Sequence, residues 1–129
     1  MGLLLFLTSE INAQTDSINK IFPNPIICFE NEMHDFGSIK KGTTITYDFK
    51  FKNTGKAPLI IDTVTTGCDC TTAEWQKVPI YNGQTGFIHI TYKSDEEGGD
   101  QAKEITVTSN AATPIKTLRF TGYVDYSGK

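Results

Sequence analysis

Residues 41–75 read KGTTITYDFKFKNTGKAPLIIDTVTTGCDCTTAEW, and this stretch decides the fold. In its first half, apolar side chains at odd-numbered positions alternate with polar side chains at even-numbered ones; the apolar positions are Ile45, Tyr47, Phe49 and Phe51. A period of two residues is that of a β-strand with one buried face. We therefore predict a strand from Thr44 to Lys52 that lies centrally in a sheet and buries its odd-numbered residues.

The second half of this stretch breaks the alternation and then returns to strand-forming residues. Residues 53–58, NTGKAP, favour a turn, and residues 59–64, LIIDTV, are an apolar run rich in β-branched side chains. The run ends at residues 67–70, GCDC, which place two thiols two positions apart in a predicted loop at the end of a strand.

Short strands are also expected on both sides of residues 41–75. Residues 26–30, IICFE, predict a first strand that contains Cys28. The side chains of Phe36 and Ile39 are expected to fill the core at the edge of the sandwich. Asn82-Gly83 is a strong turn signal before the alternating residues 87–92, FIHITY, whose residues 88, 90 and 92 share one face. Residues 93–101 predict a solvated acidic turn, because their carboxylates lack the spacing of a calcium loop. Residues 102–109 and 115–125 predict the last two strands.

About seven to eight short strands, with turns every eight to twelve residues and no helical period, indicate an all-β protein. We predict an immunoglobulin-like antiparallel β-sandwich. The Cys, Trp, Cys spacing that ties the sheets of many such domains is missing. Apolar packing is therefore expected to hold the sheets together, through Tyr47, Phe49, Phe51, Ile61, Trp75, Ile90, Val107 and Phe120.

Length and charge narrow the class of protein further. With 129 residues, 38% hydrophobic and 21% charged, the chain fits one globular domain. Its net charge of -3 argues against a general phosphate-binding surface, so nucleic acid is not expected as a partner.

The N-terminus resembles a secretory signal peptide over residues 1–13. A short apolar run from Leu3 to Leu7 precedes the small-residue site at residues 11–13, which ends in Ala13. No basic residue precedes the run, and Glu10 lies between the run and the site. The alternative is a frayed apolar terminus or an extra strand. The run is far too short for a transmembrane segment. Residues 14–25 then predict a linker and residues 26–129 the domain, which we expect to be secreted or periplasmic.

An enzyme is not expected, because the sequence contains no catalytic constellation. It has no G-x-S-x-G elbow, no H-E-x-x-H motif and no phosphate-binding glycine loop. His34 is interpreted as a polar residue near a bend and His89 as an outward-facing strand residue. The alternative is a dyad between Cys70 and one of these histidines.

Three arrangements of the cysteines remain open. Cys68 and Cys70 can form a disulfide in a very small ring, which favours redox activity. Cys28 can instead pair with one of them as a structural staple, which suits an oxidising compartment. The third arrangement is a copper or zinc site held by Cys68, Cys70 and His34, although no cofactor is required by the pattern. Asp69 disfavours a thiolate beside it unless a cation is bound.

The order of the motifs resembles the bacterial domain-of-unknown-function family 1573. The matching motifs span roughly residues 29–125 and read HDFGSIKKG, YDFKFKNTGKAPLII, TTGCDCTTAEW, PIYNGQTGFIHITY, KEITVTSNA and LRFTGYV. The family pattern has glycine between its cysteines where this chain has Asp69, and Cys28 lies outside the pattern. The resemblance implies an immunoglobulin-like module of secreted or envelope proteins, and more distantly the protein-binding sandwiches of major sperm and ciliary proteins. It implies no established activity.

We therefore predict a non-catalytic, secreted or periplasmic module that binds another protein or a component of the cell envelope. Metal binding or redox chemistry at the C-x-C loop is the alternative.

Overall fold

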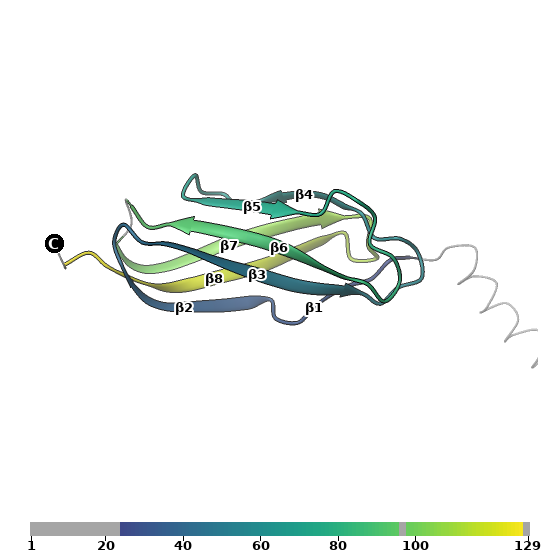
Figure 1. Ribbon diagram of the computed structural model, residues 1–129, viewed down its shortest axis with the longest axis horizontal. Coiled ribbons are helices and arrows are strands. Elements are labelled where there is room, and N and C mark those ends of the chain that lie inside the picture. Colours follow the sequence, from purple (N-terminus) through teal and green to yellow (C-terminus); the bar gives the residue numbers. More distant parts are fainter. Residues whose placement is uncertain (1–23, 96–97, 128–129) are drawn as a thin grey trace, which may run out of the picture.

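Two four-stranded β-sheets pack face to face in the computed structural model, which describes residues 24–95 and 98–127 (Figure 1). The first sheet has the order β1-β3-β6-β5, formed by β1 (Ile27–Phe29), β3 (Thr44–Asn53), β6 (Thr85–Lys93) and β5 (Thr71–Trp75). The second has the order β2-β8-β7-β4, formed by β2 (Met33–Lys40), β8 (Ile115–Asp125), β7 (Gly99–Ser109) and β4 (Ile61–Thr65). The predicted immunoglobulin-like β-sandwich is confirmed.

The first two strands, β1 and β2, lie in different sheets. β1 pairs antiparallel with β3, whereas β2 pairs parallel with β8. Among the described strands this is the one parallel pair, and it arises because the chain continues in the direction of β1 after crossing to the second sheet (Figure 1). The sequence predicted no strand over residues 33–40, where a register shift between Asp35 and Ser38 interrupts the alternation.

The core lies between the sheets and follows the predicted alternation. Phe49 and Phe51 of β3 are buried, as are residues 88, 90 and 92 of β6 and Ile105 and Val107 of β7. Of the eight residues expected to hold the sheets together, Tyr47 and Trp75 are partly buried against the core and the other six are buried. Apolar packing thus joins the sheets, because the disulfide among the described residues lies within one loop.

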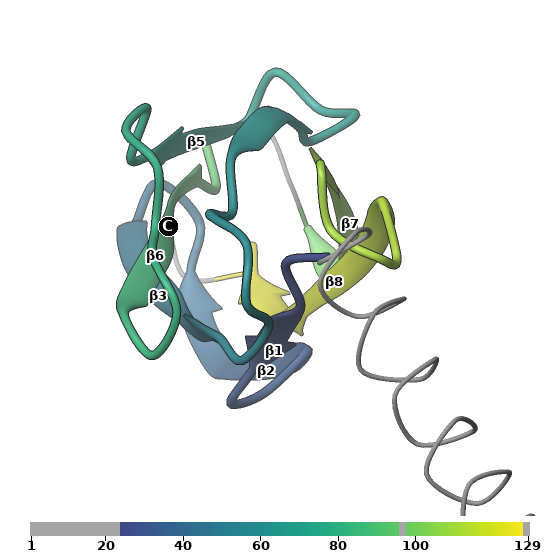
Figure 2. The same ribbon diagram turned by 90° about the vertical axis from the view of Figure 1, so that its right-hand side faces the viewer.

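The two ends of the sandwich carry different features. The described chain enters at one end, beside the β3–β4, β5–β6 and β7–β8 connections (Figure 1). Figure 2 looks onto this end, with β3 and β6 on one side of the sandwich and β7 and β8 on the other. The β4–β5 loop, which carries Cys68 and Cys70, lies at the opposite end with the C-terminus (Figure 1).

The predicted signal peptide, residues 1–13, lies outside the described residues, as does the predicted linker of residues 14–25 except its last two positions. Among the residues that the structure describes, no helix is long and apolar enough to cross a membrane.

Candidate functional site

The β4–β5 loop joins the two sheets at the edge where both strands are outermost. The sulfurs of Cys68 and Cys70 are bonded in a disulfide within this loop. Cys28 is instead a free, exposed thiol on β1, where it lies opposite Lys52 of β3. The structure therefore joins the two loop cysteines and places the third outside the pair.

Backbone and hydroxyl hydrogen bonds hold this loop independently of the disulfide. The Thr71 amide donates to the Cys68 carbonyl (3.2 Å), and the Lys93 amide of β6 donates to the Cys70 carbonyl (2.9 Å). The Thr66 hydroxyl donates to the Thr71 carbonyl at 2.9 Å. A three-residue ring removes little conformational entropy from the unfolded chain, worth about 1.6 kcal/mol against about 3 kcal/mol for a 15-residue loop. The disulfide thus contributes little to stability, because the hydrogen bonds already fix the conformation of the loop.

Cys68 and Cys70 face different surroundings. Cys68 lines a surface hollow of about 370 Å³ between the loop and residues of β7 and β8; its other lining residues are Thr66, Gly67, Ala102, Lys103, Glu104 and Arg119. Cys70 is partly buried and packs against the hydrophobic core. Both cysteines are half-buried, and they differ in that Cys68 borders the surface hollow while Cys70 borders the core.

The ligand set proposed for a metal is not brought together. His34 lies on β2, at the far edge of its sheet from β4 and the cysteine loop. Within residues 24–95 and 98–127, no group of three or more His, Cys, Asp and Glu side chains is arranged to hold a metal ion.

His34 packs between the two sheets, where its ring stacks on Tyr47 of β3 with centroids 3.6 Å apart. The centroid of the Phe120 ring on β8 lies 5.7 Å from that of the His34 ring. Burial lowers the pKa of His34 below its ordinary value of 6.5, and the carboxylate of Asp35 opposes this effect only in part. His34 is therefore a packing residue that favours the neutral imidazole.

We expect this histidine to make the domain less stable in acid. A folded pKa below the unfolded value of 6.5 means that the unfolded chain binds more protons, so the stabilisation from neutral His34 is lost as pH falls from about 6.5 through the folded pKa. Urea unfolding at several pH values should show this fall, and it should be smaller in His34→Phe, which keeps an aromatic ring beside Tyr47. Parallel pH curves for the two proteins would contradict the assignment.

A second candidate site lies on the outer face of the first sheet. Asp48 of β3, His89 of β6 and Glu74 of β5 are cross-strand neighbours in one row. The predicted outward direction of His89 is confirmed, and its Nδ1 lies 2.5 Å from Asp48 Oδ1. This row borders a groove of about 340 Å³, also lined by Trp75, Gln76 and Phe87.

The aromatic residues give this groove an apolar part. The Phe87 side chain is 38% exposed, and Lys77 Nζ lies 3.2 Å from the centre of the Trp75 ring. The Phe87 amide donates to the side-chain oxygen of Gln76 (3.1 Å), which ties the β5–β6 connection to β6. The groove thus combines two carboxylates with an exposed aromatic surface.

The free edge of β5 runs along this groove. Cys70 is hydrogen-bonded to Lys93, and hydrogen-bonded pairs alternate along an antiparallel ladder. The backbone groups that point away from β6 are therefore those of Thr71, Ala73 and Trp75. Those of Thr71 are engaged by Cys68 and Thr66, so Ala73 and Trp75 present the open part of the edge.

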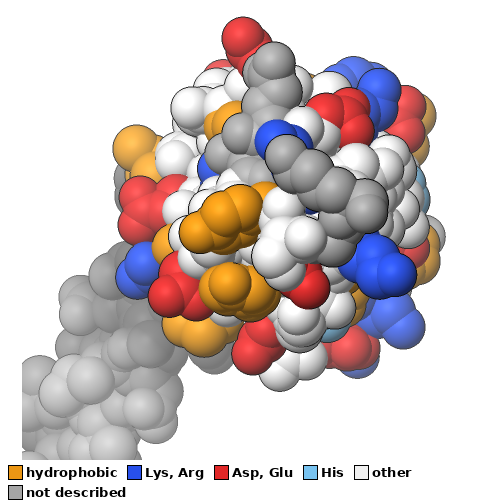
Figure 3. All heavy atoms as spheres, turned by 90° about the vertical axis from the view of Figure 1, so that its left-hand side faces the viewer, with side chains coloured by type: hydrophobic (Ala, Val, Ile, Leu, Met, Phe, Trp, Pro, Cys, Tyr) orange, Lys and Arg blue, Asp and Glu red, His pale blue; other side chains and the backbone are white. Residues whose placement is uncertain are grey.

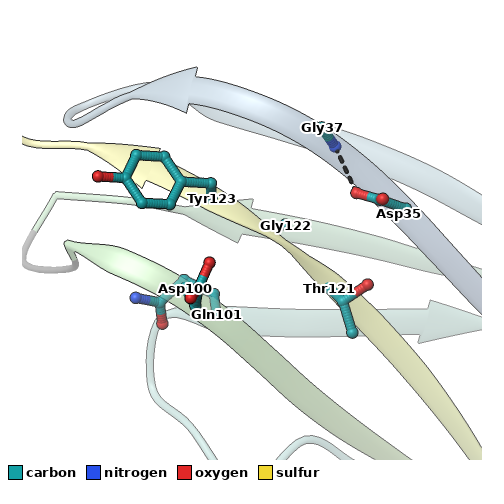
Figure 4. A pocket seen from close by; sticks show the side chains of 7 residues that line it. All are labelled: Asp35, Gly37, Asp100, Gln101, Thr121, Gly122 and Tyr123. Carbon is teal, nitrogen blue, oxygen red and sulfur yellow. Dashed lines mark hydrogen bonds between the residues drawn. The ribbon is translucent and has the colours of Figure 1, made fainter.

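A third hollow, of about 460 Å³, lies on the outer face of the second sheet, where β8 separates Asp35 of β2 from Asp100 of β7 (Figure 4). Asp35 Oδ1 accepts a hydrogen bond from the Gly37 amide (2.8 Å), which shapes the bend in β2 (Figure 4). At the C-terminal end of the sandwich, hydrophobic side chains are exposed among acidic ones (Figure 3). Neither surface brings together groups for catalysis.

Comparison with known proteins identifies a family of unknown function. A family model described as "Protein of unknown function (DUF1573)" matches residues 27–124, which confirms the resemblance seen in the motifs. No curated protein matches the chain.

Solved structures of low sequence identity share the fold. A protein of unknown function from Porphyromonas gingivalis W83 is similar with a TM-score of 0.68 and 19% identity over 77% of this chain, which spans 46% of that protein. The ASH/PapD-like domain 7 of human CEP192 has a TM-score of 0.61 and 13% identity over 80% of this chain and 86% of that one. The secreted serine protease VesC of Vibrio cholerae has a TM-score of 0.59 and 13% identity over 77% of this chain and 23% of the protease.

Proposed function

Because the chain belongs to the DUF1573 family of proteins of unknown function, we propose that it is a non-catalytic, secreted or periplasmic module that binds an extended segment of another protein. The observation that carries this proposal is the open edge of β5 beside the groove on the first sheet. The likeness to a PapD-like domain and to a secreted protease supports the proposal at the level of fold. We further propose residues 1–13 as the export signal, 14–25 as a linker and 26–129 as the binding domain.

An edge strand offers unpaired backbone donors and acceptors that an incoming strand can use. In β5 these groups belong to Ala73 and Trp75, since the disulfide loop already engages those of Thr71. Strand addition here extends the first sheet and places side chains of the partner over the groove. Backbone pairing supplies affinity, and the groove supplies specificity.

The chemistry of the groove favours a basic segment. Glu74 projects from the outer face of β5 itself, and Asp48 lies two strands away in the same row. A Lys or Arg side chain of the partner that lies over this row meets carboxylates, while its methylene groups pack on Phe87. We therefore propose an extended, basic segment as the occupant.

Site-specific photo-crosslinking in the producing cell tests this proposal. A photoreactive residue at position 87 should yield a discrete adduct, and its crosslinked peptide should be an extended segment that contains Lys or Arg. Ala73→Pro removes an outward amide without touching the bonds to β6, and Glu74→Lys reverses the charge. Each should reduce the adduct at least about tenfold, which corresponds to about 1.4 kcal/mol.

The control is Asp100→Lys, which makes the same kind of charge reversal on the outer face of the other sheet. It should leave the adduct unchanged. An adduct that is insensitive to Ala73→Pro and Glu74→Lys in folded proteins, or the absence of any adduct, would refute the β5 site. Intact mass of the same exported protein reports on processing, since cleavage after Ala13 leaves Gln14 as the first residue.

A further inference from the structure

The two sulfurs of the Cys68–Cys70 disulfide differ in their access to other molecules. Cys68 borders the surface hollow beside β7 and β8, whereas Cys70 packs against the core. Attack on a disulfide requires the incoming sulfur to approach one of the two bonded sulfurs. A thiolate that arrives from solvent therefore reaches Cys68 first.

The charges around the hollow favour an anionic reactant at Cys68. Two cations, Lys103 and Arg119, line the hollow with one carboxylate, that of Glu104, which lies opposite Arg119 across the β7–β8 pair. The Lys103 Nζ also lies 6.0 Å from the centre of the Tyr92 ring. Cationic neighbours attract a thiolate and stabilise the thiolate form of a cysteine. The exposed Asp69 lies between the two cysteines in sequence, so its negative charge disfavours a thiolate at either sulfur. The cations of the hollow line it together with Cys68, so they act on that sulfur more than on Cys70.

Hydrogen-bond donors are available to both sulfurs once the bond between them opens. The Cys70 amide already donates to Cys68 Sγ (3.2 Å). The Thr71 hydroxyl lies 3.5 Å from Cys70 Sγ and can donate to a thiolate formed there. A thiolate that leaves as Cys70 is thus stabilised where it forms.

From these contacts we propose that the Cys68–Cys70 pair is a site of thiol–disulfide exchange with a dithiol, and that Cys68 is the sulfur that forms the mixed disulfide. A thiolate of the dithiol attacks Cys68 Sγ, and the electrons of the Cys68–Cys70 bond pass to Cys70 Sγ, which takes up a proton. The second thiolate of the dithiol then attacks its own partner sulfur and releases Cys68 as a thiolate. The net reaction reduces the loop disulfide to two thiols and oxidises the dithiol to a disulfide.

A dithiol suits this loop better than a single thiol. Cys70 stays next to the mixed disulfide, held by the Lys93 amide at its carbonyl, so it re-forms the loop bond and expels a monothiol. A dithiol carries a second sulfur that competes with Cys70 within the same complex. The hydrogen bonds of the loop, described above, keep its shape when the disulfide is open. This inference is independent of the proposed binding at β5.

Two single-cysteine proteins test which sulfur reacts. Both carry Cys28→Ser; one adds Cys70→Ser and keeps Cys68, and the other adds Cys68→Ser and keeps Cys70. Incubation with glutathione disulfide, followed by mass spectrometry, measures the rate of mixed-disulfide formation. The protein that keeps Cys68 should react at least about tenfold faster, because its sulfur borders the hollow. Equal rates, or faster reaction at Cys70, would overturn the proposal.

The role of the hollow's charge is tested in the protein that keeps Cys68. Arg119→Gln should slow its reaction with the anionic glutathione disulfide several-fold and leave its reaction with the neutral bis(2-hydroxyethyl) disulfide unchanged. The matched control is Arg119→Lys, which retains the charge and should keep both rates. Equal effects of Arg119→Gln on both probes would refute electrostatic attraction at this site.

The disulfide of the Cys28→Ser protein should be opened by dithiothreitol, which ends as its own cyclic disulfide. Reduced glutathione at the same thiol concentration should give much less of the dithiol protein. The circular dichroism of the reduced protein should match that of the oxidised protein. A disulfide that resists dithiothreitol until the domain unfolds would overturn the proposal and identify the bond as structural.

Discussion

Replacing Phe49 by alanine is expected to lower the free energy of unfolding by about 3–5 kcal/mol. Phe49 lies in β3, which β1 and β6 flank on either side, and its side chain is 0% exposed. Its ring meets that of Tyr47 edge-to-face, with centroids 4.8 Å apart. The substitution leaves a cavity between sheets that no inter-sheet disulfide joins, in a domain whose total stability is expected to be about 5–15 kcal/mol.

Lys50→Ala is the matched control, because Lys50 neighbours Phe49 in the same strand and points to solvent. It should change the unfolding free energy by no more than about 0.5 kcal/mol. Urea unfolding followed by tryptophan fluorescence measures both variants. Comparable effects at the two positions would mean that the buried face of β3 has been assigned wrongly.

The sequence predicts β3 well because one side chain in two along it meets the core. The same rule predicts the buried faces of β6, β7 and β8. It fails for β2, where the positive φ of Gly37 and the shift in register after Asp35 place neighbouring residues out of phase with the faces of the sheet. The parallel pairing of β2 with β8 is also invisible in the pattern, because a period of two residues is the same for both strand directions.

In the candidate sites, too, the residue types and the facing of side chains follow from the sequence, whereas their contacts depend on how the strands pair. The C-x-C pair stands out in sequence, yet its separation from His34 depends on the order of four strands in a sheet. The outward direction of His89 follows from alternation, but its contact with Asp48 needs the register between β3 and β6. The open backbone groups of Ala73 and Trp75 depend on which β5–β6 pairs are hydrogen-bonded, and side-chain patterns carry no information on that phase.

Asn53 illustrates a residue whose role sequence reasoning missed. The sequence predicts that it lies in a turn, because Asn, Thr and Gly follow one another there. In the structure it ends β3 with its side chain 0% exposed. Its Oδ1 accepts hydrogen bonds from the amides of Ile26 (3.2 Å) and Gly55 (2.9 Å), and its Nδ2 donates to the carbonyls of Ala57 and Ile80 (2.9 Å each). One side chain thus bonds four backbone groups from three segments at the end of the sandwich where the described chain enters.

Asn53→Ala should therefore destabilise the domain by about 1–3 kcal/mol. The variant removes four hydrogen bonds. The buried Gly55 amide loses its acceptor, whereas the Ile80 carbonyl keeps its hydrogen bond from the Leu59 amide (2.8 Å). Each buried group without a partner costs about 1–3 kcal/mol. The exposed Asn31, replaced by alanine as the control, should change stability by no more than about 0.5 kcal/mol.

Asn53→Asp separates the loss of the donor from the loss of packing, because Asp has nearly the same shape. It keeps an acceptor for Ile26 and Gly55 but turns a carboxylate oxygen toward the carbonyls of Ala57 and Ile80. This repulsion and burial raise the pKa of the new carboxyl in the folded state, so the folded protein binds more protons and Asn53→Asp should regain stability as pH falls. Asn53→Ala carries no titrating group and should show no such recovery relative to the wild type. Urea unfolding of both variants from pH 7 to pH 5 distinguishes them, and parallel curves would show that Nδ2 does not need to donate here.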